Sequence, residues 1–174
     1  MKDEVQKRWY AVYIAPKAEK KVSERFSQNL ISHYLPTKKV IRQWSDRKKE
    51  VIVPVINGYI FVNIKDTEFR KILDIYGAIA FVSENKLPVA IPDYQIDRLK
   101  SMVQYADEQV EFSMEEFIPG ETVKIIKGPL AGIMVELIDI NGKHKVIVRL
   151  DGFGCALTTV PMSFIERVTS KSQY

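Results

Sequence analysis

Residues 53–64 read V-P-V-I-N-G-Y-I-F-V-N-I and contain the strand signal that decides the fold. A proline and an Asn-Gly pair interrupt the apolar run, and residues 59–64 are then rich in aromatic and β-branched side chains, which predicts a strand. Successive side chains of a strand point to opposite faces. One face therefore carries Ile60, Val62 and Ile64, and the other carries Tyr59 and Phe61.

Both faces of this predicted strand are apolar, although an antiparallel strand with one wet face alternates apolar and polar residues. Something must therefore cover each side. In one interpretation this is a central strand that helices of the same protein cover on both sides. In the other, Tyr59 and Phe61 line a surface that is kept for another protein.

The composition is that of a globular protein without metal or disulfide chemistry. The chain has 174 residues, 46% of them hydrophobic, enough for one ordinary domain or two small ones. No apolar run approaches the roughly 20 residues of a membrane helix, and the charged start lacks the apolar core of a signal peptide, so we expect a cytoplasmic protein. Cys155 is the only cysteine and His33 and His144 are the only histidines, so we expect neither metal nor cofactor.

The positive charge is concentrated at the start of the chain. Residues 1–50 hold 13 of the 26 basic side chains and only 6 acidic ones, whereas residues 107–118 hold 5 acidic and no basic ones. A concentrated positive potential favours a polyanion, for which nucleic acid is the obvious candidate. The alternative is a solvated basic face that binds nothing.

Residues 1–106 read as a mixed α+β domain. Pro16 suits a helix start, and the apolar residues Ala18, Val22, Phe26 and Leu30, spaced four apart, predict an amphipathic helix to about residue 32. The order strand, helix, hairpin, strand, helix, strand, helix indicates an antiparallel sheet with packed helices. The strands are expected at 9–14, 34–44, 50–53, 59–64 and 79–83, and the later helices at about 66–76 and 92–105.

Two groups of basic residues are candidates for nucleic-acid contact. Lys17, Lys20 and Lys21 project away from the apolar stripe of the first helix, where they serve solubility or contact phosphates. The second group surrounds Trp44 at the hairpin tip, and cations interleaved with an aromatic residue suit single-stranded or junction nucleic acid. Lysine on an exposed hairpin also discourages aggregation. The tip cations are Lys38, Lys39, Arg42, Arg47, Lys48 and Lys49.

The composition changes after residue 106. The acidic stretch 107–118 shows no clear period and is predicted to be a linker. Five short strands separated by turn signals, at 122–126, 134–140, 145–150, 155–160 and 165–168, then predict a small barrel over 119–170, followed by a tail at 171–174. Cys155 would be a small buried strand residue.

Three stretches together resemble the NusG-type transcription elongation factors. They are W-Y-A-V-Y at 9–13, N-G-Y-I-F-V at 57–62 and G-E-T-V-K-I-I-K-G-P-L-A-G at 120–132. The resemblance implies an NGN domain over 1–106 and an SH3-like KOW barrel over 119–170. The stretch K-V-I-V-R-L-D-G-F-G-C-A-L is most similar to specialised RfaH-like and UpxY-like paralogues, which act on long operons such as those for capsular polysaccharide.

This resemblance implies a factor, not an enzyme, that binds RNA polymerase and promotes processive transcription. In the family, an apolar depression on the NGN domain receives the clamp of the polymerase's largest subunit. The family motif falls on Tyr59 and Phe61, with wall positions at Phe81 and Ile96 and a second polymerase contact at Thr67 and Glu68.

The resemblance also implies contact with the non-template DNA strand. This contact falls near the first strand and helix, at Tyr13, Lys17, Lys20 and Lys21, to which the hairpin adds Arg42, Arg47 and Lys48. The KOW barrel would bind a ribosomal protein or a termination factor, and we expect a monomer. In RfaH-like members the last domain can refold as helices, whereas the β-branched strands and the Asn141-Gly142 turn here favour the barrel.

Departures from the family pattern keep alternatives open. Asn57 stands where the family usually has proline, which predicts a changed turn, and Met134 stands where a glycine is common, which favours protein docking over nucleic-acid binding by the barrel. The alternative functions are a housekeeping NusG-like factor and a ribosome-associated KOW protein that binds RNA. An enzyme is disfavoured because the sequence has no phosphate-cradling, G-x-S-x-G or paired-carboxylate motif.

Overall fold

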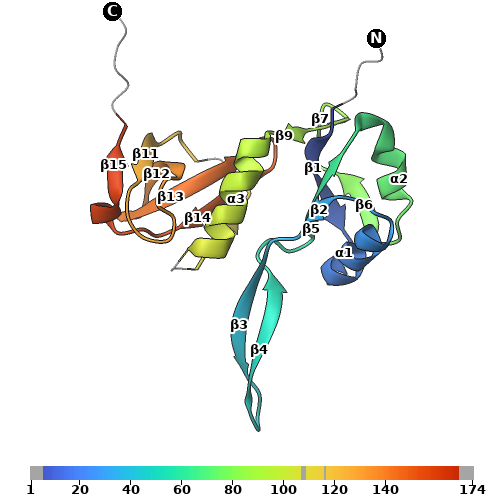
Figure 1. Cartoon of the computed structure of the whole chain (residues 1–174), viewed down its shortest axis with the longest axis horizontal. Helices are drawn as coiled ribbons and strands as arrows, with labels where there is room; N and C mark the ends of the chain where they lie inside the picture. The colour runs from blue at the N-terminus through green and yellow to red at the C-terminus, as the bar shows by residue number, and fades with distance from the viewer. Residues whose placement is uncertain (1–5, 107–108, 116, 169–174) are drawn as a thin grey trace, which may run out of the picture. The chain divides into compact units, whose positions relative to one another are not determined.

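The computed structural model describes residues 6–106, 109–115 and 117–168 (Figure 1). The chain divides into two compact units. The first runs to Ile96 and includes Asp151–Phe153, and the second runs from Asp97 to Leu150 and continues from Gly154. None of the helices in the described ranges is long and apolar enough to cross a membrane.

The first unit is built on an antiparallel sheet in the order β2-β5-β1-β6, with β9 also paired to β1. The central strands β1 and β5 pair along their lengths, from Arg8 opposite Ile64 to Tyr13 opposite Tyr59. The decisive stretch of sequence is therefore a central strand of this sheet. The strands are β1 (Arg8–Ile14), β2 (His33–Tyr34), β5 (Tyr59–Ile64), β6 (Ala78–Phe81) and β9 (Ala90–Ile91).

Helices α1 (Glu19–Gln28) and α2 (Phe69–Leu73) pack against one face of this sheet. The predicted alternation of β5 is confirmed, because its even-numbered residues belong to the core under these helices, together with Tyr10, Val12 and Ile14 of β1. The core consists of Tyr10, Val12, Ile14, Val22, Phe26, Ile31, Ile60, Val62, Ile64, Ile72 and Phe81.

Two helices end earlier than their periodicity predicted. Helix α1 ends at Gln28, and Leu30, which the four-residue stripe placed in the core, has φ of 56° and is 92% exposed. Leu73, the last residue of α2, and Tyr76, which follows the helix, are also exposed. A short 3-10 turn, η1 (Asp66–Glu68), precedes α2. The predicted helix ends were wrong because the period of apolar residues does not indicate the residue at which a helix ends.

The expected hairpin is present as a separate two-stranded sheet of β3 (Thr37–Gln43) and β4 (Lys48–Pro54). Figure 1 shows it extending away from the sheet of the first unit as a narrow ribbon. A second small hairpin pairs β7 (Ser83–Glu84) with β8 (Leu87–Pro88).

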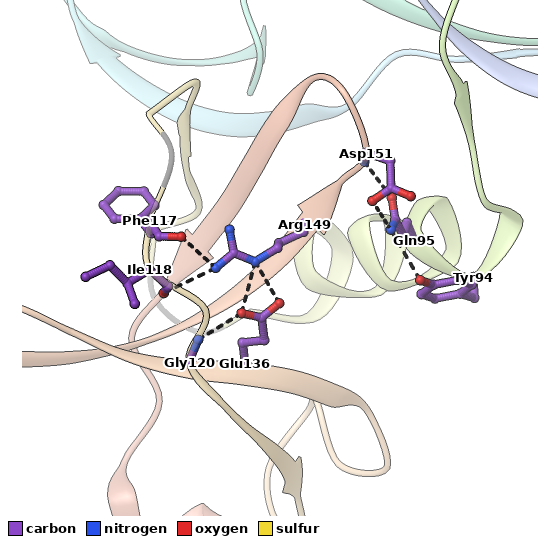
Figure 2. Close-up of polar contacts among 8 residues, drawn as sticks. All are labelled: Tyr94, Gln95, Phe117, Ile118, Gly120, Glu136, Arg149 and Asp151. Atoms are coloured by element: carbon purple, nitrogen blue, oxygen red, sulfur yellow. Dashed lines mark hydrogen bonds and ion pairs between the residues drawn. The ribbon is translucent and has the colours of Figure 1, made fainter.

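Helix α3 (Asp93–Tyr105) begins after Pro92, as predicted, and contains the point at which the two units divide. Ile96 and Leu99 are fully buried. Within the first unit the Gln95 amide donates to the Asp151 carboxylate over 2.8 Å, and the Asp151 N–H donates back to the Gln95 oxygen over 2.7 Å (Figure 2). This pair explains why a polar side chain is buried on α3.

The second unit contains a six-stranded antiparallel sheet in the order β10-β14-β13-β12-β11-β15. Asn141 and Gly142 join β12 to β13 with φ of 54° and 75°, the two positive values that a tight hairpin turn requires. All five predicted strands are present, so the predicted α+β fold with a strand-rich second domain is confirmed. They are β11 (Glu121–Ile125), β12 (Met134–Ile140), β13 (Lys143–Leu150), β14 (Gly154–Thr158) and β15 (Ile165–Arg167), the last preceded by η2 (Met162–Phe164).

The expected linker contributes a strand to this sheet. Residues Glu111–Ser113 of the stretch 107–118 form β10 and pair with β14. An ion pair holds β10 beside the sheet, because the Lys145 Nζ lies 2.5 Å from the Glu111 carboxylate. Asp107, Glu108 and Glu116 of the acidic stretch, and the tail 171–174, lie outside the described residues.

A single arginine holds the segment before β11 against the barrel strands (Figure 2). The Nε of Arg149 donates to both Glu136 carboxylate oxygens, at 2.7 and 3.0 Å, and its Nη2 donates to the Phe117 carbonyl at 3.1 Å. The same carboxylate accepts the Gly120 N–H at 3.1 Å. The hydrogen bond to Glu136 raises the pKa of the guanidinium. The chain direction after residue 117 therefore depends on this ion pair.

Candidate nucleic-acid interface

A groove of about 850 Å³ opens between the end of β1, the start of α1 and the hairpin, all within the first unit. Two stretches that are distant in sequence, residues 13–21 and 42–58, meet there. We call it the basic groove. The described residues that line it are Tyr13, Ile14, Pro16, Lys17, Glu19, Lys20, Lys21, Arg42, Val51, Ile52, Val53, Pro54, Asn57 and Gly58.

The lysines of the basic groove are positioned by the first turn of α1. Lys17 has φ of 61°, and the Ala18 N–H donates to the Ala15 carbonyl at 3.0 Å, so a turn precedes the helix. Because Val22 lies in the core beneath the helix, Lys20 and Lys21 stay exposed beside it. The helix thus directs its apolar side into the domain and its cations toward the groove.

Glu19 fixes the floor of the basic groove, and it is buried although its side chain is a carboxylate. Its Oε1 accepts the Gly58 N–H at 2.8 Å, and the Gly58 carbonyl accepts the Ile14 N–H, also at 2.8 Å. Gly58 has φ of 79°, a conformation that glycine adopts without strain. The start of α1, the end of β1 and the turn before β5 are therefore tied together at one point.

The net charge of the groove is positive. Glu19 is the one carboxylate among its described lining residues, against four cations: Lys17, Lys20, Lys21 and Arg42. The carboxylate also lies in the first turn of α1, where the helix dipole favours a negative charge. The groove therefore presents a surplus of cations beside the partly exposed ring of Tyr13.

The structure brings five of the seven predicted nucleic-acid residues to this groove. Arg47 and Lys48 lie instead at the far end of the hairpin, where Lys48 is opposite Gln43 and on the other face from Arg42. Sequence reasoning missed Glu19 and the apolar wall of Val51 and Val53. A buried glutamate in a lysine-rich first turn has no distinguishing pattern, and only the hairpin register shows which valines face the lysines.

Tyr59 and Phe61 share a face of β5, as predicted, but they differ in exposure. Tyr59 is partly exposed and its ring lies 5.4 Å from that of Tyr13. Phe61 is fully buried. Within the first unit both rings meet Phe153, at 4.7 Å from Tyr59 and 5.6 Å from Phe61.

The other predicted polymerase-binding residues lie elsewhere. Phe81 pairs with Val12 across β6 and β1 and packs edge-on against Tyr10, so it belongs to the core under the helices and not to the face of Phe61. The expectation that Phe81 forms a wall beside Tyr59 and Phe61 therefore does not match this structure. The reason is register, because residues opposite each other on paired strands share a face.

Ile96, Thr67 and Glu68 complete the predicted set. Ile96 is fully buried on α3, and Thr67 is exposed in η1. Glu68 is partly exposed and its Oε2 accepts the Lys65 N–H at 2.9 Å, which caps the turn before α2. The structure does not gather these three residues into one site with Tyr59.

The fold defines the class of protein. A solved structure of NusG from Thermotoga maritima has the same fold, with a TM-score of 0.52 and 23% sequence identity, and it covers 94% of this chain and 98% of that one. An antiparallel α+β domain followed by a strand-rich unit is thus the NGN and KOW arrangement expected from the sequence.

Sequence comparison gives the family. Residues 7–100 match the family described as Transcription termination factor nusG. The transcription termination/antitermination protein NusG of Pasteurella multocida is 24% identical over 92% of this chain and 94% of its own length. That of Rickettsia prowazekii is 24% identical over 91% of this chain and 88% of its own. This chain belongs to the NusG family of transcription termination and antitermination factors.

Proposed function

We propose that this protein is a transcription elongation factor and antiterminator that holds the non-template DNA strand in the basic groove while its first domain binds RNA polymerase. The observation that carries the proposal is that Tyr13, Lys17, Lys20 and Lys21 of the stretch 13–21 line one groove together with Arg42 of the hairpin.

The chemistry of the groove supports a single nucleic-acid strand. Lysines are point charges that attract phosphates without reading bases, and a neighbouring tyrosine ring offers a surface on which a base can stack. A volume of about 850 Å³ accommodates a few nucleotides. Binding of this kind weakens as salt rises, because each neutralised phosphate releases counterions.

The proposed polymerase surface centres on Tyr59. Its ring is partly exposed beside Tyr13, and burying it against a partner would contribute about 1.5–3 kcal/mol. The partner we propose is the clamp of the polymerase's largest subunit, with Thr67 and Glu68 as a second contact. Holding the clamp and the displaced strand together would disfavour pausing.

The similarity of residues 145–157 to specialised paralogues extends the proposal to target choice. We propose a factor dedicated to long operons of the capsular polysaccharide type, on the basis of the stretch K-V-I-V-R-L-D-G-F-G-C-A-L. A housekeeping role would instead give the same polymerase binding with no preference among operons, so transcript levels across the genome in a deletion strain separate the two.

Co-purification of the full-length protein with core RNA polymerase tests the polymerase surface. We expect retention of the wild type and loss for Tyr59→Ala. Tyr76→Ala is the matched control, because Tyr76 is an 83% exposed tyrosine of the same unit outside the proposed surface. Circular dichroism confirms that each variant is folded. Retention of Tyr59→Ala at the wild-type level would show that the surface is wrong.

Titration with a fluorescent single-stranded oligonucleotide tests the groove. Lys20→Gln with Lys21→Gln removes two groove cations, and Lys71→Gln with Lys86→Gln removes two exposed lysines from the same unit outside the groove. If both groove lysines contact phosphates, the slope of log affinity against log salt falls by about 1.4 for the first pair only. Equal losses in the two double variants would refute specific binding in the groove.

A further inference from the structure

The two faces of the β3–β4 hairpin differ in charge. Arg42 is opposite Lys49, Val40 is opposite Val51, and Lys38 is opposite Val53, so these six residues share one face. Three members of this set (Arg42, Val51 and Val53) also line the basic groove. We call it the groove face. It is therefore continuous with the surface that carries the lysines of α1.

The other face carries the carboxylate of the strands. Lys39 and Glu50 lie there, and the Lys39 Nζ is 3.0 Å from the Glu50 carboxylate. Ile41 and Ile52 also lie on that face and are 73% and 47% exposed, although Ile52 borders the basic groove as well. Among the described strand residues of the hairpin, the groove face thus has three cations and no carboxylate, whereas the opposite face has two cations, Lys39 and Lys48, and the carboxylate of Glu50.

Trp44 stands at the far end of the groove face. Its N–H donates to the Arg47 carbonyl at 2.8 Å, which continues the strand pairing by one position and places Trp44 two residues beyond Arg42 on the same face. The side chain is 56% exposed. The carboxylate of Asp46 in the turn lies 3.9 Å from Arg47. The indole is thus a large apolar surface that is exposed to solvent at the end of the hairpin.

We propose that the groove face and Trp44 form a track for a single-stranded polynucleotide, which leaves the basic groove, follows the hairpin and stacks an unpaired base on the indole. This inference rests on the proposed function, because the track begins in the basic groove. Lys38, Arg42 and Lys49 contact phosphates along the way, and Trp44 supplies the stacking platform that sequence-tolerant single-strand binding uses.

The exposed indole favours a single strand over a duplex. An indole stacks only on a base that is not already stacked on both sides, as is the case for an unpaired base. The seven residues of β3 span about 23 Å. The track therefore adds several nucleotides to the length of strand that the groove alone can hold.

Oligothymidylates of 4 and 12 nucleotides and the full-length protein test this inference by fluorescence titration. The 12-mer should bind more tightly and quench Trp44, while Trp9, which is 7% exposed, contributes little change. Trp44→Ala should weaken the 12-mer roughly 5- to 150-fold, and Trp44→Phe should restore most of the binding. The 4-mer should be nearly unaffected by either change.

Lys38→Gln and Lys39→Gln provide a matched pair, because these adjacent residues lose the same charge on opposite faces. Lys38→Gln should weaken the 12-mer and reduce its salt slope by about 0.7, and Lys39→Gln should leave both near the wild-type values. Equal effects of the two changes, an unaltered affinity of Trp44→Ala, or tighter binding of a 12-base-pair duplex would each overturn the track.

The control in the groove separates failure of the track from failure of the proposed function. If Lys20→Gln with Lys21→Gln weakens both oligonucleotides while Lys38→Gln and Trp44→Ala do not, the track is wrong and the groove stands. If none of these changes alters binding, both are wrong. Parallel titrations with oligodeoxythymidine and oligouridine of equal length show whether the track takes DNA, RNA or both.

Discussion

Replacement of Glu19 tests the physical basis of the basic groove, because this residue links its floor. Gln keeps an oxygen that can accept the Gly58 N–H but exchanges a charged hydrogen bond of about 1.5–3 kcal/mol for a neutral one of about 0.5–1.5. It also removes a carboxylate from the first turn of α1, at about 0.3–1 kcal/mol. Glu19→Gln should therefore lower the free energy of unfolding by about 1–2 kcal/mol.

Glu19→Ala should cost more than Glu19→Gln. The Gly58 N–H then has no side-chain acceptor at the groove floor, and a buried donor left without a partner adds a penalty of about 1–3 kcal/mol. The total loss is about 2–4 kcal/mol. The two variants therefore separate the contribution of the hydrogen bond from that of the charge.

Urea unfolding in a Trp44→Phe background measures both changes. This background leaves Trp9, a buried residue of β1, as the single tryptophan reporter of the first unit. A loss of 1–2 kcal/mol lowers the midpoint by roughly 0.5–1 M. Glu19→Gln should also strengthen oligonucleotide binding at low salt, because the groove loses its one described carboxylate. Equal stability of the Gln and Ala variants would refute the role given to this hydrogen bond.

Three further perturbations test the packing of both units. Gly77→Ala should destabilise the first unit by about 2–5 kcal/mol in urea unfolding, because φ of Gly77 is 100° and the new Cβ would lie 2.6 Å from the Val22 side chain. A loss below 1 kcal/mol would contradict this steric conflict. Arg149→Met should cost about 1–3 kcal/mol in calorimetry, reduced from a fully buried pair because Arg149 and Glu136 are partly exposed; an unchanged transition would be inconsistent with the ion pair. The pKa of Tyr10 is raised to about 12, first by burial of the hydroxyl and then by its hydrogen bond to the Asp66 carboxylate. The raised pKa stabilises the folded protein fully below pH 10, and this stabilisation is lost as pH rises from about 10 through about 12. Tyr10→Phe should flatten that alkaline decline in urea midpoints, and an identical decline in the variant would exclude this explanation.

Much of the fold was predictable because local pattern and tertiary structure agree. The alternation in residues 59–64 matches the faces of β5, and the Asn141-Gly142 pair matches the turn between β12 and β13. Element ends were less predictable. Leu30 continues the four-residue period of α1, yet the chain turns with a positive φ there and leaves the side chain in solvent. The strand β10 was missed because three residues that pair only through tertiary contact have no period of their own.

The candidate site was predictable in its residue types and less so in its arrangement. Lysine spacing in α1 indicated cations on one side of the helix, and the structure places them at the basic groove. That Arg42 joins them, while Lys48 points to the other hairpin face, depends on the strand register. Register also places Phe81 under the helices. Register is set by pairing between segments, so a single-strand pattern could not supply it.

The hairpin forms a sheet of its own, and this has a consequence for how the protein can vary among relatives. Its ladder joins only β3 to β4, so a change in its length leaves the pairing of the main sheet intact. Because side chains alternate with a period of two, insertion of two residues in each strand lengthens the ribbon and preserves its faces, whereas one residue in each strand exchanges them beyond that point. Natural or engineered hairpins should therefore change the reach of the protein in two-residue steps while the domain beneath stays the same.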